Sequence, residues 1–132
     1  MVELRMVQNK DKKLLYNLMQ KYLYEMSNYY DNDIDVEGNY SYRYFEDYFT
    51  DYTRKAILIL KDKEIAGFML LNSHSYIGGN PDNVIAEFSI LPKYRKCHIA
   101  KIAVEKLFHN YPGTWEIKYN VQNTPAVVLS KS

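Results

Sequence analysis

The sequence predicts a mixed α/β fold in which helices flank a mostly antiparallel central sheet. Three observations lead to this prediction. Apolar runs and apolar–polar alternation of strand length recur along the chain. Two longer segments carry apolar side chains at the three- and four-residue spacing of amphipathic helices, and clusters of turn residues separate the segments. The expected order is β-α-α-β-β-β-α-β-(α), and a chain of 132 residues is expected to form one domain over residues 1–132.

The first part of the chain is expected to contain one strand and two helices. Residues Val2 to Val7 alternate apolar and polar side chains, which is typical of a strand. Residues Lys10 to Tyr29 carry one apolar stripe at helical spacing, and Asn9 is suited to cap this helix. An acidic loop follows over Asp31 to Asn39. The aromatic side chains of Tyr40 to Asp51 recur at spacings that favour a short second helix.

The middle of the chain has the pattern of a hairpin followed by a further strand. Lys55 to Leu60 and Ile65 to Leu71 are apolar runs, and the charged segment Lys61 to Glu64 between them is typical of a hairpin turn. Gly78 to Asn83 is a cluster of turn residues. Val84 to Leu91 is therefore expected to be the fourth strand, which a proline ends.

The last part of the chain predicts a helix, a strand and the opening of another helix. Cys97 to Asn110 carry a second apolar stripe, and Pro112-Gly113 ends it. Thr114 to Tyr119 are expected to form the fifth strand. Asn123 to Ala126 are typical of the start of a helix, because they place a proline in the first turn.

Composition and charge narrow the classes of function. Seventeen Lys and Arg against sixteen Asp and Glu leave a net charge of +1, which gives no general attraction to nucleic acid or to a membrane surface. No apolar run approaches the roughly 20 residues of a membrane span, and the first residues lack the apolar core of a signal peptide. Cys97 is the only cysteine, which suits a reducing compartment. We therefore expect a cytoplasmic protein that binds neither nucleic acid nor membranes.

The segment from Glu87 to Ala100 resembles the central motif of the GNAT superfamily of N-acetyltransferases. In that family a fourth strand runs into a loop of pattern [Gln/Arg]-x-x-Gly-x-[Gly/Ala] and then into a long helix. Arg95 occupies the first position of this pattern and Ala100 the last. Asn123-Thr124-Pro125-Ala126 resembles the motif that follows, in which Asn and Ala open the next helix. The expected order of elements is also similar to that of the family from the first residue onward.

The resemblance implies a binding site for acetyl-coenzyme A, which the family uses as a co-substrate. A loop that runs into a helix N-terminus presents unpaired N–H groups and the positive end of the helix dipole, which suits a pyrophosphate. In the family, the arm of the coenzyme lies between the fourth and fifth strands and pairs with strand backbone. The matching cofactor-binding residues on this chain are Ser89, Ile90, Leu91, Arg95, Lys96, Cys97, His98, Ile99, Ala100 and Asn123.

The resemblance further implies transfer of the acetyl group to a primary amine by direct attack, with a small molecule or a peptide as acceptor. A carboxylate on the fourth strand, acting through water, is a usual base, and Glu87 lies at such a position on the same strand face as Ser89. The alternative is that Glu87 is a surface carboxylate on a half-exposed face. His74 and Cys97 are further candidates, for proton transfer and nucleophilic attack, although such side chains are more often simply solvated.

The acidic loop and the tyrosines around it have two interpretations each. Acidic residues alternate from Asp31 to Glu37 as in a calcium-binding loop, but Val36 and Tyr42 occupy the positions that require Gly and Glu. We therefore expect no metal site. The loop either attracts a cationic amine or is solvated, and the tyrosines either line an acceptor pocket or an interface, or pack in the core.

The chain departs from the family pattern at three points. His98 stands where the family usually has Gly, which tolerates unusual dihedrals and lets backbone approach phosphate. Ser130 stands where a Tyr often protonates the leaving thiolate. The chain also stops one turn into the expected last helix, without the usual last two strands, as in a truncated chain, a short gene product or a protomer that a homodimer completes. The alternatives to an enzyme are a non-catalytic coenzyme-binding or protein-interaction module, and a fold that has lost the coenzyme.

Overall fold

The computed structural model describes residues 1–73, 81–117 and 127–130. The strands are β1 (Val2–Met6), β2 (Lys55–Lys61), β3 (Glu64–Asn72), β4 (Asn83–Ile90), β5 (Thr114–Ile117) and β6 (Val127–Ser130). The helices are α1 (Lys12–Met26), α2 (Asp47–Thr50) and α3 (Ile99–Asn110), with 3₁₀ turns at Asn9–Asp11 and Pro92–Tyr94.

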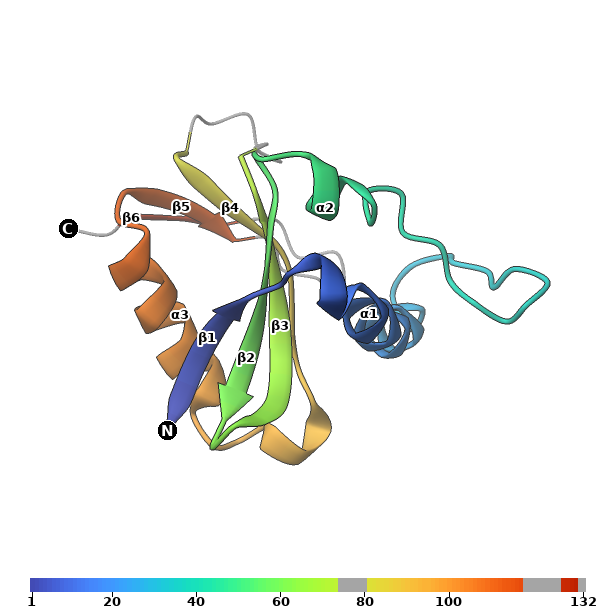
Figure 1. The fold of residues 1–132 in the computed structure, drawn as a ribbon, viewed down its shortest axis with the longest axis horizontal. Helices are drawn as coiled ribbons and strands as arrows, with labels where there is room; N and C mark the ends of the chain where they lie inside the picture. The colour runs from blue at the N-terminus through green and yellow to red at the C-terminus, as the bar shows by residue number, and fades with distance from the viewer. Residues whose placement is uncertain (74–80, 118–126, 131–132) are drawn as a thin grey trace.

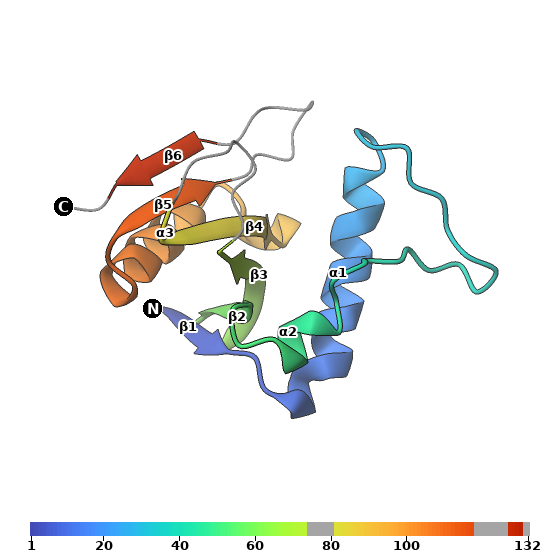
Figure 2. The same ribbon diagram turned by 90° about the horizontal axis from the view of Figure 1, so that it is seen from above.

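The six strands form one sheet in chain order, and neighbouring strands run antiparallel except for β4 and β5, which are parallel. Helix α3 covers one face of the sheet, and α1 and α2 cover the other (Figures 1 and 2). The predicted mixed α/β fold with a mostly antiparallel sheet is thus confirmed. The parallel pair requires a crossover, and α3 supplies it.

Each face of the sheet carries its own apolar core. Because side chains alternate along a strand, β2 and β3 contribute to both cores. The face under α3 holds Val2, Ile57, Met69, Ile85, Ile99, Ala103, Leu107 and Trp115. The face under α1 holds Leu15, Met19, Tyr22, Phe45, Leu58, Phe68 and Leu70.

Two helix predictions differ from the structure in detail. The predicted helix over Tyr40 to Asp51 is helical only at Asp47–Thr50. A turn precedes it, in which the Phe45 N–H donates to the Tyr42 carbonyl at 3.1 Å. A second turn leads into the helix, in which the Tyr48 N–H donates to the Phe45 carbonyl at 3.2 Å. Phe45 and Tyr48 are buried against α1, so their three-residue spacing reflects consecutive turns.

The expected helix cap at Asn9 is also not used. Asn9 begins the 3₁₀ turn, and Asp11 receives the hydrogen bond from the Gln8 N–H at 3.0 Å instead. Asp11 also accepts a hydrogen bond from Arg5 at 3.2 Å, so its carboxylate ties the end of β1 to the start of α1.

The expected continuation of a last helix is wrong for the residues that the structure describes. Val127–Ser130 form β6, which pairs antiparallel with β5, and Ser130 lies opposite Thr114. Two β-branched residues open this strand, and the backbone groups at the edge of β5 need partners, so tertiary pairing decides its structure. The expected helix opening, Asn123 to Ala126, lies outside the described residues.

Two β-bulges shape the centre of the sheet. In β3 the register shifts around Ala66, because Leu60 lies opposite Ile65 whereas Ile59 lies opposite Gly67. In β4 it shifts around Ala86, which stands between the residues opposite Leu70 and Leu71. Bulges bend a strand and re-aim its side chains.

Gly67 beside the first bulge leaves no room for a side chain. A Cβ atom there would lie 2.2 Å from the carbonyl oxygen of Ser89. Gly67→Ala is therefore expected to lower the free energy of unfolding by about 1–3 kcal/mol, measured by denaturant titration. Glu64→Ala is the control, since Glu64 lies exposed on the same strand. An equal or larger loss in the control would contradict the steric explanation.

Candidate active site

Among the described residues, β4 pairs with β5 before its bulge. This pairing places Asn83 to Ile85 opposite Trp115 to Ile117. The Leu91 N–H donates to the Ala66 carbonyl at 2.7 Å. Because bonded pairs alternate in an antiparallel ladder, the backbone of Ser89 faces β3, whereas the N–H and C=O groups of Phe88 and Ile90 face away from it.

The predicted set Ser89, Ile90 and Leu91 is therefore divided by the geometry of the strand. Ile90 directs its backbone to the side of β4 away from β3. Leu91 is engaged within the chain, because its carbonyl accepts a hydrogen bond from the Tyr94 N–H at 2.9 Å. Phe88, which sequence analysis did not single out, directs its backbone to the same side as Ile90.

A cleft of about 390 Å³ opens between β4, the C-terminal half of α1 and the start of α3. Its lining includes Tyr22, Glu25, Met26, Phe88, Ser89, Ile90, Arg95 and Ala100. A second hollow of about 370 Å³ adjoins it and shares Tyr22, Glu25, Ser89 and Arg95. The predicted loop and the predicted strand thus meet at one cleft.

The loop before α3 has an unusual backbone. Lys96 and His98 have φ values of +68° and +61°, in the left-handed region that favours glycine. His98 is the N-cap residue of α3, and no side chain of the described residues caps this helix end. The first intrahelical bond runs from the Ile102 N–H to the His98 carbonyl, at 3.1 Å. The N–H groups before it are oriented for an anion.

Arg95 bridges the mouth of the cleft. Its two terminal nitrogens donate to the carboxylate oxygens of Glu25 at 2.8 and 2.9 Å, and its Nε donates to the Ile90 carbonyl at 2.7 Å. The hydrogen bonds from Arg95 lower the pKa of Glu25, and those to Glu25 raise the pKa of Arg95. The arginine therefore joins α1 to the end of β4.

Glu87 is a buried carboxylate. It is 6% exposed, which contradicts the alternative of a half-exposed surface carboxylate. One oxygen accepts a hydrogen bond from the Tyr22 hydroxyl at 2.6 Å, and the other accepts one from the Tyr42 hydroxyl at 3.0 Å. Burial first, and then the charge of Glu87 and its hydrogen bond, raise the pKa of Tyr22 far above its usual range. Tyr22 therefore stays protonated and donates to Glu87.

Tyr22, Tyr42 and Glu25 are site residues that sequence analysis missed in these roles. Tyr22 belongs to the apolar stripe of α1. Because a buried tyrosine hydroxyl generally needs a polar partner, its place in this stripe was the one sign in the sequence that it has such a partner. Glu25 carried no signal, because its partner Arg95 is 70 residues away in the chain.

Two of the remaining candidates, Cys97 and the acidic loop, form contacts of their own. Cys97 is exposed, and its Sγ lies 3.6 Å from the Arg95 carbonyl oxygen. Asp35 in the acidic loop accepts hydrogen bonds from the N–H groups of Glu37 and Asn39, at 2.8 and 3.0 Å. Within the described ranges, no three His, Cys, Asp or Glu side chains converge where they could hold a metal ion. His74 and Asn123 lie outside the described residues.

The fourth strand of a six-stranded sheet leads through a loop into α3, and a cleft lies where this strand, the loop and α1 meet. A comparison with protein families matches residues 14–127 to the acetyltransferase (GNAT) family. The match covers most of the chain, and the protein therefore belongs to this family. A comparison with curated proteins gave no match. Of the helices that the structure describes, none has the length and apolar character needed to cross a bilayer.

Solved structures of acetyltransferases share the fold. An acetyltransferase from Thermus thermophilus has a TM-score of 0.62 and 17% identity, over 88% of this chain and 74% of that chain. A predicted acetyltransferase from Clostridium acetobutylicum, solved with acetyl-CoA, has a TM-score of 0.57 and 18% identity, over 83% and 73%. The PaiA N-acetyltransferase from Thermoplasma acidophilum, in complex with coenzyme A, has a TM-score of 0.56 and 14% identity, over 94% and 82%.

The ion pair between Glu25 and Arg95 predicts a pH dependence of stability. Because the folded-state pKa of Glu25 is lowered, its contribution is complete above the unfolded-state pKa and is lost as the pH falls through the folded-state pKa. Glu25→Gln should therefore reduce the free energy of unfolding near neutral pH and approach the wild type at acidic pH. Denaturant titrations over this range test it, with the exposed Glu64→Gln as control. A pH-independent difference would contradict the assignment.

Proposed function

We propose that this protein transfers the acetyl group of acetyl-coenzyme A to a primary amine of a small molecule or peptide. The observation that carries the proposal is the cleft beside β4, where Phe88 and Ile90 line the wall and direct their backbone groups away from β3. Family membership supports acetyl transfer as the reaction. The neighbours solved with coenzyme A or acetyl-CoA support the co-substrate.

The residues present suit the coenzyme. Backbone N–H groups at the start of α3 and the cationic side chains of Arg95 and Lys96 would hold the pyrophosphate. The residues that would contribute are Arg95, Lys96, Cys97, His98, Ile99 and Ala100. The N–H groups of Phe88 and Ile90 would pair with the amides of the arm, as an added strand does. Arg95 occupies the Ile90 carbonyl, so use of that carbonyl requires the side chain to turn away.

Proton transfer is assigned to Glu87 acting through Tyr22. The coenzyme supplies an acetyl thioester, and a backbone N–H of β4 stabilises the negative charge that develops on its carbonyl oxygen. Tyr22 lines the cleft and donates to the buried Glu87. The amine proton therefore passes to the Tyr22 oxygen as the Tyr22 proton passes to Glu87. A departing thiol with a pKa of about 8.5 leaves as the thiolate without a general acid.

This assignment makes Glu87 and Tyr22 testable as one unit. Glu87→Gln is expected to reduce kcat about 10²–10⁴-fold, the usual contribution of a general base. Tyr22→Phe should reduce kcat as well, and the double variant should lose little more than Glu87→Gln alone, because both belong to one proton path. The affinity for coenzyme A, measured by calorimetry, should be unchanged. Glu64→Gln is the matched control, and an unaltered kcat in Glu87→Gln would reject the base.

The left-handed backbone at His98 predicts the effect of restoring the family's glycine. A non-glycine residue in this conformation costs about 1–2 kcal/mol, and His98 also places a Cβ beside the phosphate site. His98→Gly should raise the melting temperature and tighten the binding of coenzyme A. Lys63→Gly is the control, since Lys63 also has a positive φ, of +73°, but does not line the cleft. It should raise stability only. Weaker coenzyme binding in His98→Gly would instead indicate that the His98 imidazole binds the phosphate.

A non-catalytic module is the second candidate, and the engagement of the Ile90 carbonyl by Arg95 favours it. Thermal unfolding with and without acetyl-coenzyme A separates the two. A ligand at one hundred times its Kd adds about 2.7 kcal/mol of stability. Binding with turnover of an amine supports the enzyme, and binding without turnover of any amine supports a coenzyme-binding module. No binding overturns the enzyme and supports an interaction module that does not use the coenzyme.

A further inference from the structure

Strand β1 presents an open edge on the side of the sheet away from the cleft. It pairs with β2 alone and ends the sheet in the part of the chain that the structure describes (Figure 2). The Asp62 N–H donates to the Met1 carbonyl and the Val7 N–H to the Ala56 carbonyl, both at 2.9 Å.

These two bonds fix which backbone groups of β1 remain for a partner. Both obey the register in which Leu4 lies opposite Ile59, so the odd-numbered residues of β1 bond to β2. The N–H and C=O groups of Val2, Leu4 and Met6 therefore point outward, away from the sheet. An edge of this kind is a template for another strand.

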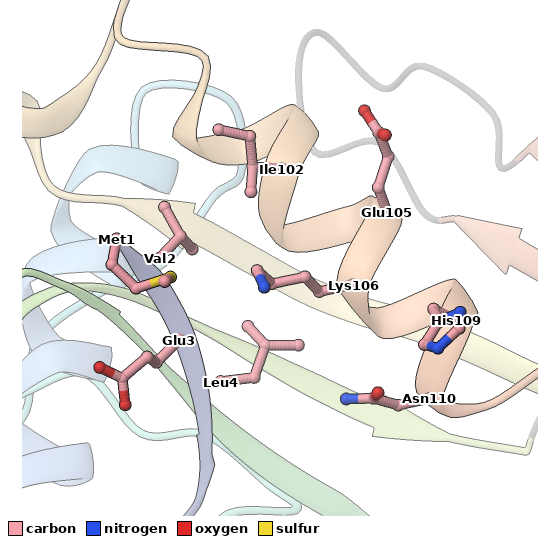
Figure 3. Close-up of a pocket in the computed structure, with 9 residues that line it drawn as sticks. All are labelled: Met1, Val2, Glu3, Leu4, Ile102, Glu105, Lys106, His109 and Asn110. Atoms are coloured by element: carbon pink, nitrogen blue, oxygen red, sulfur yellow. The ribbon is translucent and has the colours of Figure 1, made fainter.

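A groove lies beside this edge, between β1 and α3 (Figure 3). Its volume is about 610 Å³, and its lining includes Met1, Val2, Leu4 and Ile102. Met1 is 73%, Met6 41% and Ile102 39% exposed. The groove shares no lining residue with the cleft at β4, so it is separate from the proposed chemistry.

The residues of β1 form a self-complementary series. Reading Val2, Glu3, Leu4, Arg5 and Met6 in either direction gives apolar and charged side chains in alternation, with opposite charges on the two sides of Leu4. Glu3 is exposed, and Arg5, which is 40% exposed at its side chain, is held by Asp11. An arginine has five N–H donors, so Arg5 can bind a second carboxylate.

We propose that two copies of this chain associate through antiparallel pairing of β1 with β1, with Leu4 on the two-fold axis. Leu4 then bonds to Leu4 of the partner subunit, and Val2 bonds to Met6 of the partner subunit. Every outward N–H and C=O group of these residues is paired. Glu3 lies opposite Arg5 of the partner subunit at a non-bonded position, where side chains come closest.

Charge selects this register over its neighbours. A shift of two residues in one direction places Glu3 opposite Glu3 of the partner subunit, and a shift in the other direction places Arg5 opposite Arg5 of the partner subunit. Like charges directly opposite each other destabilise a strand pair. A second copy supplies the matching order of charges, and it also brings its own Met6 and Leu4 to the apolar side of the edge. The proposal is independent of the proposed function, since the cleft at β4 stays open.

A charge-reversal pair tests the dimer. Glu3→Arg places like charges opposite each other in its own homodimer, and so does Arg5→Glu. Each variant should therefore sediment as a monomer at a concentration where the wild type is a dimer. A mixture of the two variants juxtaposes opposite charges at both positions and should restore a dimer of one copy of each. Circular dichroism confirms that each variant is folded, and acetyl-coenzyme A binding serves as the readout that should not change.

Hydrogen exchange of the wild type keeps the test decisive if Arg5→Glu does not fold. Raising the protein concentration should slow exchange at the Val2, Leu4 and Met6 amides and leave the Phe88 amide unaffected. A wild type that sediments as a monomer at all concentrations would overturn the proposal. A dimer that survives Glu3→Arg, or one without protection at Leu4, would also overturn it, because the contact would then lie elsewhere or involve a different segment.

Discussion

The bulge at Ala86 in β4 is the constraint on which the site depends. Up to Ile85, β4 pairs with β5 in parallel. Beyond the bulge, β4 keeps its pairing with β3 and lines the cleft. The same strand then leads through Pro92 into the loop before α3. One bulged strand thereby places backbone groups that face away from β3 beside the start of a helix, as a ligand with amides and phosphates requires.

Two polar contacts attach α1 to β4 and to the loop that follows it. Tyr22 donates a hydrogen bond to Glu87, whose buried carboxylate would cost free energy without a partner. Glu25 accepts a hydrogen bond from Arg95. Both partners on α1 lie on the turns that face the cleft. The helix therefore serves the site as well as the core, and its position decides how wide the cleft opens. The edge at β1 is formed by other residues and carries its own self-complementary charges.

Much of the fold followed from local patterns. Strand alternation, the two apolar helical stripes and the turn clusters predicted the order from β1 to β5, and the pattern around Arg95 predicted where the loop meets the helix. The site was predicted less completely. Glu87 was identified from its strand position, but its tyrosine partners were not, because Tyr22 is 65 residues away in the chain. The aromatic spacing near Tyr48 was ambiguous, since consecutive turns and a helix share a three-residue repeat.

The sequence by itself determined the fold class, the family and the positions of the strand and loop that form the cleft, because these depend on local periodicity and on a short motif. Tertiary structure alone decided three other features. It assigned Val127–Ser130 to a strand, since the edge of β5 needs partners. It buried Glu87 between two hydroxyls, and it joined Arg95 to Glu25. These contacts join residues far apart in the chain, where only packing brings charge and hydrogen-bonding groups together.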